Sequence, residues 1–544
     1  MNTDRILSNN AATGQFWHGE RSALVLDAVA VKAALLRLEQ PYWIVQKDGQ
    51  LGLVEGGAIS NEKINGSAGF DVIGRIPSIT LDTLGDPSFC STYGTRYAYY
   101  TGAMANGIAS EQLVIAMGKA GMLGSFGAAG LPPARIEAAI GEIQEALGVD
   151  GPYAFNLINS PSAPEAEMST AELLVKHKVH TAEASAYVDM TIPLVYYRVA
   201  GLTETPDAQI VAQNRVIGKL SRREVARLFL SPPPLDILDR LLAEGKITPR
   251  QAELALHVPM ADDITVEADS GGHTDNRPLV SMFAGMVALR NELQEEYQYP
   301  TPIRLGAAGG ISTPESALAA FMMGAAYIAT GSVNQSCLEA GTSEHTRKLL
   351  AQAEMADVAM APASDMFEMG VRVQVLKRGT LFPIRAQKLW EVYDTYHNWE
   401  EVPQAEREKL EKMVFKRTFE DIWVGTEQFF EQRDPRQNER ARKDPHHKMA
   451  LVFRWYLGLS SRWSNGGEQG REMDYQVWCG PSMGAFNDWV RGTYLEQPEN
   501  RRVADIAYHI LTGAAFLSRQ RIFNLHGGHL PLTQTSYLPD GALL

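Results

Sequence analysis

The chain has 544 residues and a formal net charge of -14, with 45% hydrophobic and 21% charged residues. This composition is ordinary for a folded protein, and the length allows a large domain plus a second one, because single cores seldom grow beyond about 300 residues. The negative charge argues against a nucleic-acid partner, since phosphate binding usually needs a basic domain. An acidic protein partner would likewise need a local basic patch.

The cysteines and the first residues favour a cytoplasmic protein. Cys90, Cys337 and Cys479 are odd in number, and none has a Cys-x-x-Cys or paired Cys/His spacing. A disulfide framework is therefore not expected, and no metal site is predicted. Residues 1–5 lack the layout of a signal peptide, and no uncharged apolar run reaches the length of a membrane span. We therefore expect cytoplasmic localisation and no membrane partner.

Residues 1–80 are predicted to form a small cap packed on the domain that follows. Residues 23–38 have helical periodicity. Two apolar runs, 42–46 and 51–54, flank an Asp-Gly turn, which is typical of a β-hairpin. Nothing in this segment has a pattern that indicates catalysis.

Residues 81–340 alternate between short apolar runs and helix-like segments, which predicts a parallel α/β protein. Eight such runs can be counted, the number that closes a (β/α)8 TIM barrel. The predicted strands are 97–104, 121–126, 153–158, 179–184, 215–219, 263–269, 302–307 and 327–330. Residues 341–544 are predicted to form a mainly helical C-terminal domain.

One connection in the predicted barrel, at about residues 221–262, is much longer than the usual length of about 2–6 residues. Helices are expected at 222–230 and 235–243, and Thr248 followed by Pro249 has the order of a third helix start. We predict that this insertion is a helical lid over the active face of the barrel, shaping a substrate pocket.

The last two predicted strands end in turns that suit a phosphate site. Gly309 and Gly310 follow one strand, and Gly331 and Ser332 follow the next. The loops after TIM-barrel strands form the active face, and these two commonly bind phosphate through backbone N–H groups. Plain tight turns would have the same residues. The strand before them ends in Gly-Gly-His273, and this order of three motifs is more specific.

The order resembles the nitronate monooxygenase and flavin-dependent enoyl reductase superfamily, whose barrels bind FMN. Five longer segments are similar to the trans-acting enoyl reductases of polyunsaturated fatty acid synthases and trans-acyltransferase polyketide synthases; they are 99–107, 123–130, 268–278, 367–382 and 453–464. The resemblance covers residues 81–513. It implies an oxidoreductase that uses FMN and NADPH to reduce the 2,3 double bond of a 2-enoyl thioester carried on acyl carrier protein.

The resemblance also implies roles for residues at the predicted strand ends. His273 is expected to be catalytic, facing flavin and substrate, because histidine titrates near neutral pH; a water molecule could donate the proton instead. The expected FMN contacts are Ala103, Met104, Asn156, Lys219, Gly309, Gly310, Gly331 and Ser332. Taken without the family, Met104 also suits a core position and Asn156 a core amide bonded to backbone. For Glu183 and Glu267, solvated or salt-bridged positions are expected at least as much as a role in the site.

No GxGxxG motif follows a predicted strand, so NADPH is expected to visit the flavin face without a domain of its own. Two basic stretches, 372–388 and 433–448, suit either solvated surfaces or a docking site for an acidic carrier protein. A homodimer is expected. The alternatives are a nitronate monooxygenase-type oxidase, a non-catalytic synthase scaffold, and a phosphosugar lyase or isomerase. The last is disfavoured because no Schiff-base lysine or metal cluster accompanies the turns.

Overall fold

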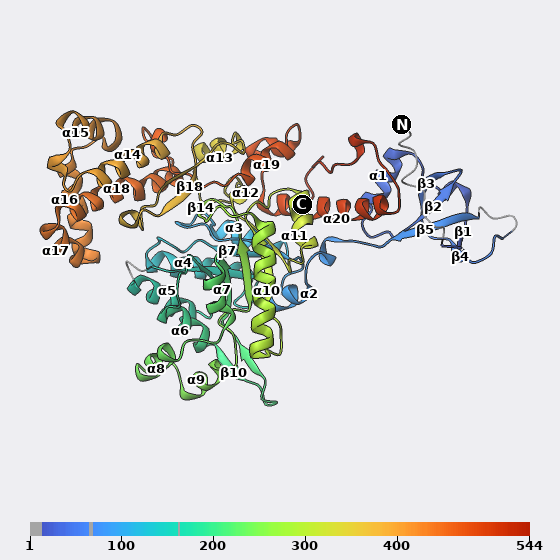
Figure 1. Cartoon of the computed structure of the whole chain (residues 1–544), viewed down its shortest axis with the longest axis horizontal. Coiled ribbons are helices and arrows are strands. Elements are labelled where there is room, and N and C mark those ends of the chain that lie inside the picture. The colour runs from blue at the N-terminus through green and yellow to red at the C-terminus, as the bar shows by residue number, and fades with distance from the viewer. Residues whose placement is uncertain (1–12, 65–68, 161–163) are drawn as a thin grey trace, which may run out of the picture.

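The computed structural model describes residues 13–64, 69–160 and 164–544. The segment 1–5, in which the sequence predicts no signal peptide, lies outside the described residues. A central barrel is flanked on one side by an N-terminal sheet and on the other by a mainly helical C-terminal region (Figure 1).

The barrel is closed, and its strands follow one another around it in chain order, beginning with β6 and returning to it from β16. All neighbouring pairs are parallel. The strands are β6 (Tyr99–Thr101), β7 (Leu123–Phe126), β8 (Tyr153–Ile158), β9 (Thr181–Ser185), β12 (Arg215–Leu220), β13 (Asp263–Glu267), β15 (Arg304–Ala308) and β16 (Ile328–Thr330). Each of the eight predicted runs contains one of them or overlaps it, so the TIM-barrel prediction is confirmed.

Helices cover the outside of the barrel because each buries one apolar face against the strands. In α4 the buried residues are Ile136, Ala139, Ile140 and Ile143, the spacing of one helical face. The covering helices are α3 (Glu111–Lys119), α4 (Pro133–Leu147), α5 (Pro164–Lys176), α6 (Ile192–Ala200), α7 (Arg223–Leu230), α10 (Leu279–Tyr297) and α11 (Pro314–Met322). The four-residue helix α12 (Ser332–Gln335) begins directly after β16, at the C-terminal end of the barrel.

The long connection after β12 is helical, as predicted, but it is not a lid over the active face. It continues from α7 into α8 (Leu235–Ala243) and α9 (Pro249–Ala255). The Gln251 amide donates to the carbonyl of Ala200, the last residue of α6, and Arg250 pairs with Glu204 of the hairpin strand β10 (Leu202–Glu204). Barrel helices run opposite to the strands, so α6 ends at the N-terminal end of the barrel. Figure 1 accordingly shows α8, α9 and β10 together, far from β14 (Gly272–His273).

The N-terminal region contains a five-stranded sheet in the order β3-β2-β5-β1-β4. The predicted hairpin is confirmed as β2 and β3, and its turn residues Asp48 and Gly49 both have positive φ. The other three strands of this sheet were not predicted. The elements are β1 (Phe16–His18), α1 (Ala28–Leu36), β2 (Tyr42–Lys47), β3 (Gln50–Val54), β4 (Ala58–Ser60) and β5 (Phe70–Ile76).

This sheet does not pack directly on the barrel strands, as the predicted cap would. Its apolar face shares a core with Phe516, Leu517 and Phe523 of α20 (Val503–Leu525), the long C-terminal helix that also packs along α11. The buried Arg519 of α20 donates to the carbonyls of Leu38, Gln40 and Pro77 at the base of the sheet. The last helix therefore joins the first domain to the barrel.

The C-terminal region is mainly helical, as predicted, and also contributes two strands to the barrel mouth. Strands β17 (Val358–Pro362) and β18 (Arg372–Leu376) form a small sheet with β14, in the order β14-β18-β17. The further helices are α13 (Glu344–Ala351), α14 (Phe382–Thr395), α15 (Gln404–Leu410), α16 (Phe419–Arg433), α17 (Pro435–Lys443), α18 (Pro445–Gly466) and α19 (Ser482–Trp489).

Among the described helices, none combines the length and the apolar run that crossing a membrane requires.

Candidate active site

A lysine and two glutamates form a charged cluster inside the C-terminal end of the barrel. Lys219 Nζ lies 3.2 Å from Glu183 Oε1 and 3.5 Å from Glu267 Oε1, on three successive strands. Glu183 is fully buried and also accepts hydrogen bonds from the Tyr100 hydroxyl and the Ala103 N–H. The salt-bridged alternative for Glu183 and Glu267 is thus confirmed.

The cluster keeps its lysine charged. Burial opposes the ammonium, but the charges of Glu267 and Glu183 outweigh it and raise the pKa of Lys219. Burial likewise opposes ionisation of Glu183, yet Lys219 lowers the pKa of that carboxyl. For Glu267 burial prevails over the attraction of Lys219, and its pKa is raised. The barrel mouth thus contains a permanent cation beside one firmly ionised carboxylate.

His273 lies at the rim of the same mouth, held on β14 by pairing with Val373 of β18. Its Nε2 is 3.4 Å from Asp365 Oδ1, at ion-pair distance but without the alignment of a hydrogen bond. Burial lowers the pKa of His273, but the nearby charges of Asp365 and Glu267 outweigh it, so the pKa is raised above its usual value. The imidazole can therefore stay protonated at a higher pH than a free histidine.

Replacing Asp365 by Asn is expected to lower the pKa of His273, because the main group that raises it loses its charge. If the reaction needs the imidazolium, the alkaline limb of the pH–rate profile would therefore shift to lower pH. An NMR titration of His273 in both proteins provides the check. An unmoved titration would show that Asp365 does not control this histidine.

The two predicted phosphate turns lie side by side at the mouth, because β15 and β16 are neighbours. Gly310 has φ +74° and nothing within 4 Å of where a Cβ would stand, and the space before Gly331 is also open. Gly331 caps α12, whose first residue is Ser332. Within the described part of the chain, no group accepts a hydrogen bond from the N–H of Gly310, Gly331 or Ser332. Such free donors fit a phosphate group.

A segment from the C-terminal region closes one side of these turns. Gly480 donates its N–H to Ser332 Oγ at 3.0 Å, which leaves the Ser332 O–H free to donate to a ligand. The neighbouring Cys479 passes so close to Gly271 that a Cβ there would stand 2.7 Å from its nitrogen. Residues 479 and 480 therefore link the turn after β13 to the turn after β16.

The remaining predicted FMN contacts lie on the other side of the mouth. Asn156 donates its amide to the Glu183 carbonyl at 3.3 Å and to Ser185 Oγ at 3.0 Å, and among the described residues none donates to its Oδ1. The Ala103 N–H donates a hydrogen bond to Glu183, whereas the Ala103 carbonyl is left to bind a ligand. Met104 is only partly buried. The structure thus gathers the predicted residues at one end of the barrel.

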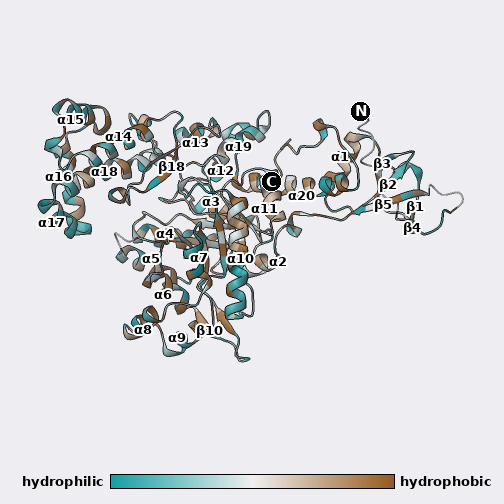
Figure 2. Ribbon diagram, viewed as in Figure 1, coloured by the Kyte–Doolittle hydropathy of each residue, from teal (hydrophilic) through white to brown (hydrophobic). Residues whose placement is uncertain are grey.

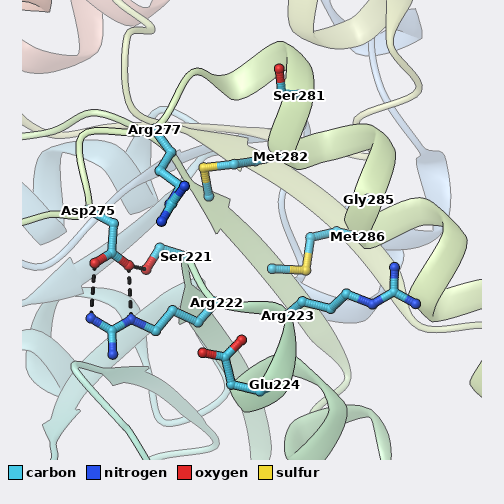
Figure 3. Close-up of a pocket in the computed structure, with 10 residues that line it drawn as sticks. All are labelled: Ser221, Arg222, Arg223, Glu224, Asp275, Arg277, Ser281, Met282, Gly285 and Met286. Atoms are coloured by element: carbon cyan, nitrogen blue, oxygen red, sulfur yellow. Dashed lines mark hydrogen bonds and ion pairs between the residues drawn. The ribbon is translucent and has the colours of Figure 1, made fainter.

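A cavity of about 420 Å³ lies beside the turn that follows His273, between the first residues of α7 and α10 (Figure 3). Arg222 binds Asp275 through two hydrogen bonds, and the side chain of Arg277 extends over the cavity. Within the described residues Arg277 makes no ion pair. Met282 and Met286 form the apolar side. This rim could receive an anionic ligand that reaches toward the histidine.

Some groups at the mouth were not predicted from the sequence. Asp365 follows β17, and Gln374 of β18 donates to Asp269 Oδ1 and the Ser270 carbonyl, holding the Gly-Gly-His turn. Both lie about a hundred residues after the barrel strand that they support, so no local motif indicates them. Tyr100 could have been suspected, because a polar hydroxyl in an apolar strand needs a partner.

Family models match three parts of this chain, including the barrel. Residues 97–414 match the nitronate monooxygenase family model. The chain belongs to the nitronate monooxygenase family. The family is named for an oxidoreductase, in agreement with the predicted reaction class. Residues 17–78 match the N-terminal domain of fatty acid synthase subunit PfaD, and residues 396–475 match the inserted helical domain of [acyl-carrier-protein] S-malonyltransferase.

Individual proteins are also similar to this chain. A polyunsaturated fatty acid synthase subunit of Thraustochytrium sp. is 50% identical over 81% of this chain and 30% of its own length. The polyketide biosynthesis protein PksE of Bacillus subtilis is 45% identical over 82% of this chain and 58% of its own. The chain thus spans less than two thirds of these relatives. The crystal structure of the enoyl reductase domain of MlnA, from the macrolactin biosynthesis cluster of Bacillus amyloliquefaciens, has a TM-score of 0.78 and 41% identity, covering 82% of this chain and all of that one.

Proposed function

We propose that this protein is a trans-acting enoyl reductase, which uses FMN and NADPH to reduce the 2,3 double bond of 2-enoyl thioesters carried on acyl carrier protein. The observation that carries the proposal is the barrel mouth, where free N–H donors of the Gly310 and Gly331 turns lie at the same end as His273 and Lys219. The likeness to the MlnA enoyl reductase domain supports the same reaction. The likeness to synthase subunits supports a place in polyunsaturated fatty acid or polyketide biosynthesis.

The residues at the mouth fit FMN. The phosphate would accept hydrogen bonds from the N–H groups of Gly310, Gly331 and Ser332, where no side chain intervenes. The flavin ring would lie beside Ala103 and Met104, with Lys219 as the cation near its polar edge and Asn156 as an amide partner. The chemistry that FMN supplies when bound is hydride transfer, from NADPH to the β-carbon of the enoyl thioester.

His273 would hold the proton that the α-carbon needs. Its raised pKa favours the imidazolium, and Asp365 lies 3.4 Å from the Nε2 atom of the ring. A water molecule held by the imidazole is the alternative donor. Arg277, which makes no ion pair among the described residues, supports binding of the phosphates of NADPH at the rim beside the turn that follows His273.

Visible absorbance of the purified protein under anaerobic conditions tests the proposal. The flavin band should bleach with NADPH and return when a 2-enoyl thioester on a carrier protein or pantetheine is added. Recovery with air or a nitronate, but not with the thioester, would favour the nitronate monooxygenase activity for which the family is named. A protein that cannot be loaded with FMN would instead be a synthase scaffold.

Replacing Gly310 by Ala is expected to weaken FMN binding about tenfold or more, because the methyl group would occupy open space in front of the donors. The positive φ alone costs about 1–2 kcal/mol of folding free energy. Gly324→Ala is the matched control, since Gly324 also has positive φ and open space but lies after α11. Equal FMN affinity in both variants, measured by flavin fluorescence, would remove Gly310 from the phosphate site.

A further inference from the structure

A long groove lies in the C-terminal region, outside the candidate active site. It has a volume of about 1160 Å³ and is bounded by β17, the two ends of β18, α14, α15 and the short π-helix Glu411–Phe415. We propose that this basic groove docks the acidic carrier protein that presents the thioester. The inference rests on the proposed function, because that function requires a tethered substrate.

The charge of the groove is opposite to that of the whole protein. Its exposed cations Arg372, Lys377 and Lys409 make no ion pair among the described residues, whereas Lys388 is paired with Glu406. The chain as a whole carries a formal charge of -14. Unpaired cations gathered on one surface of an acidic protein attract an acidic partner and set its orientation.

Apolar side chains occupy the same groove. Ile384 is 69% exposed, Met413 51% and Leu381 37%, and all three line it. Apolar groups with charged neighbours are typical of a surface that a protein partner covers. A helix that carries carboxylates beside a few apolar residues would match both features. This is the chemistry expected of a small acidic carrier.

The other basic stretch, 433–448, does not offer such a surface. Arg440, Arg442 and Lys448 pair with Glu368, Glu427 and Glu420, and α17 lies on the hydrophilic outer edge of the region (Figure 2). Several of its cations are therefore neutralised within the protein. The two stretches also differ in their surroundings, because Arg372 and Lys377 line a groove that contains exposed apolar side chains, whereas α17 has a hydrophilic surface.

The groove is linked to the mouth by one strand. Arg372 lines the groove, and the next residue, Val373, pairs with His273. Successive Cα atoms are about 3.8 Å apart, so β18 leads directly from the docking surface to the histidine. A carrier in the groove would hold its flexible thioester arm at the edge of the candidate site.

Charge reversal tests the groove on the full-length protein. The combined variant Arg372→Glu, Lys377→Glu and Lys409→Glu should raise KM for a carrier-bound enoyl thioester about tenfold or more. Turnover of the same enoyl group on free pantetheine should not change. Arg521→Glu is the control, because Arg521 is exposed on α20 and has no ion pair among the described residues. An unchanged KM for the carrier substrate, or an equal loss on both substrates, would overturn the proposal.

A direct binding measurement separates this inference from the proposed reaction. Wild-type protein should bind the acidic holo-carrier in a salt-dependent manner, and the triple variant should bind it at least tenfold more weakly. If neither thioester is reduced but this difference is seen, the reductase function fails and the docking surface stands. If both proteins bind the carrier equally, or the triple variant only changes the oligomeric state, the groove is not the carrier site.

Discussion

Replacing His273 by Ala should lower the rate of enoyl thioester reduction by about 10²–10⁴-fold, the usual contribution of a positioned general acid. The raised pKa of His273 and its position beside Asp365 are the reasons for this expectation. FMN content and the rate of flavin bleaching by NADPH should stay near those of the wild type, because neither needs the proton. Stopped-flow absorbance resolves the two half-reactions.

The matched control is His177→Ala, which removes a histidine that pairs with Glu137 on the outside of the barrel. It should leave both half-reactions unchanged. If His273→Ala retained full turnover with FMN bound, the proton would come from water, and His273 would have no place in the mechanism. If the variant lost FMN as well, the histidine would instead help to build the cofactor site.

Replacing Lys219 by Met should destabilise the protein by about 3–5 kcal/mol near pH 8, the usual cost of removing one partner of a buried ion pair. Glu183 would be left fully buried beside Glu267, without the cation that lowers its pKa. In such a site the carboxyl pKa values rise above those of the unfolded chain. The folded variant then binds protons more tightly, so its stability is lost as pH rises and partly returns toward pH 5.5.

Urea unfolding of the variant and the wild type at pH 5.5 and pH 8 measures this difference. Lys176→Met is the control, because Lys176 pairs with Glu137 on the surface and such pairs contribute about 1 kcal/mol or less. A loss that is the same at both pH values would show that packing around the Lys219 side chain, not its charge, is what the cluster needs.

Much of the barrel could be predicted from sequence because its rules are local. Each of the eight strands contains a short apolar run, and Gly309 and Gly331 directly follow strand ends, while His273 comes six residues after the end of β13. The lid prediction failed because helical periodicity does not say at which end of a barrel a helix packs. Contacts such as Gln251 to Ala200 decide that. Asp365 could not be predicted as a partner of His273, because only the pairing of β14 with β18 brings them together.

The N-terminal sheet shows a similar limit. Its hairpin was predicted from an Asp-Gly turn, but β1 and β4 are three-residue strands, too short to show alternation. Their pairing is fixed by contacts across the sheet. From the sequence, this segment is expected to pack on the barrel as a cap. Its actual support, α20, comes from the other end of the sequence.

That support has a consequence for synthesis on the ribosome. Arg519, which closes the base of the N-terminal sheet, lies 442 residues after Pro77, whose carbonyl it binds. At about 5–20 residues per second, translation of that interval takes roughly 20–90 s. During this time the apolar face around Ile44 and Leu53 has no α20 to cover it. The nascent chain therefore leaves part of this apolar face uncovered until α20 has been synthesised.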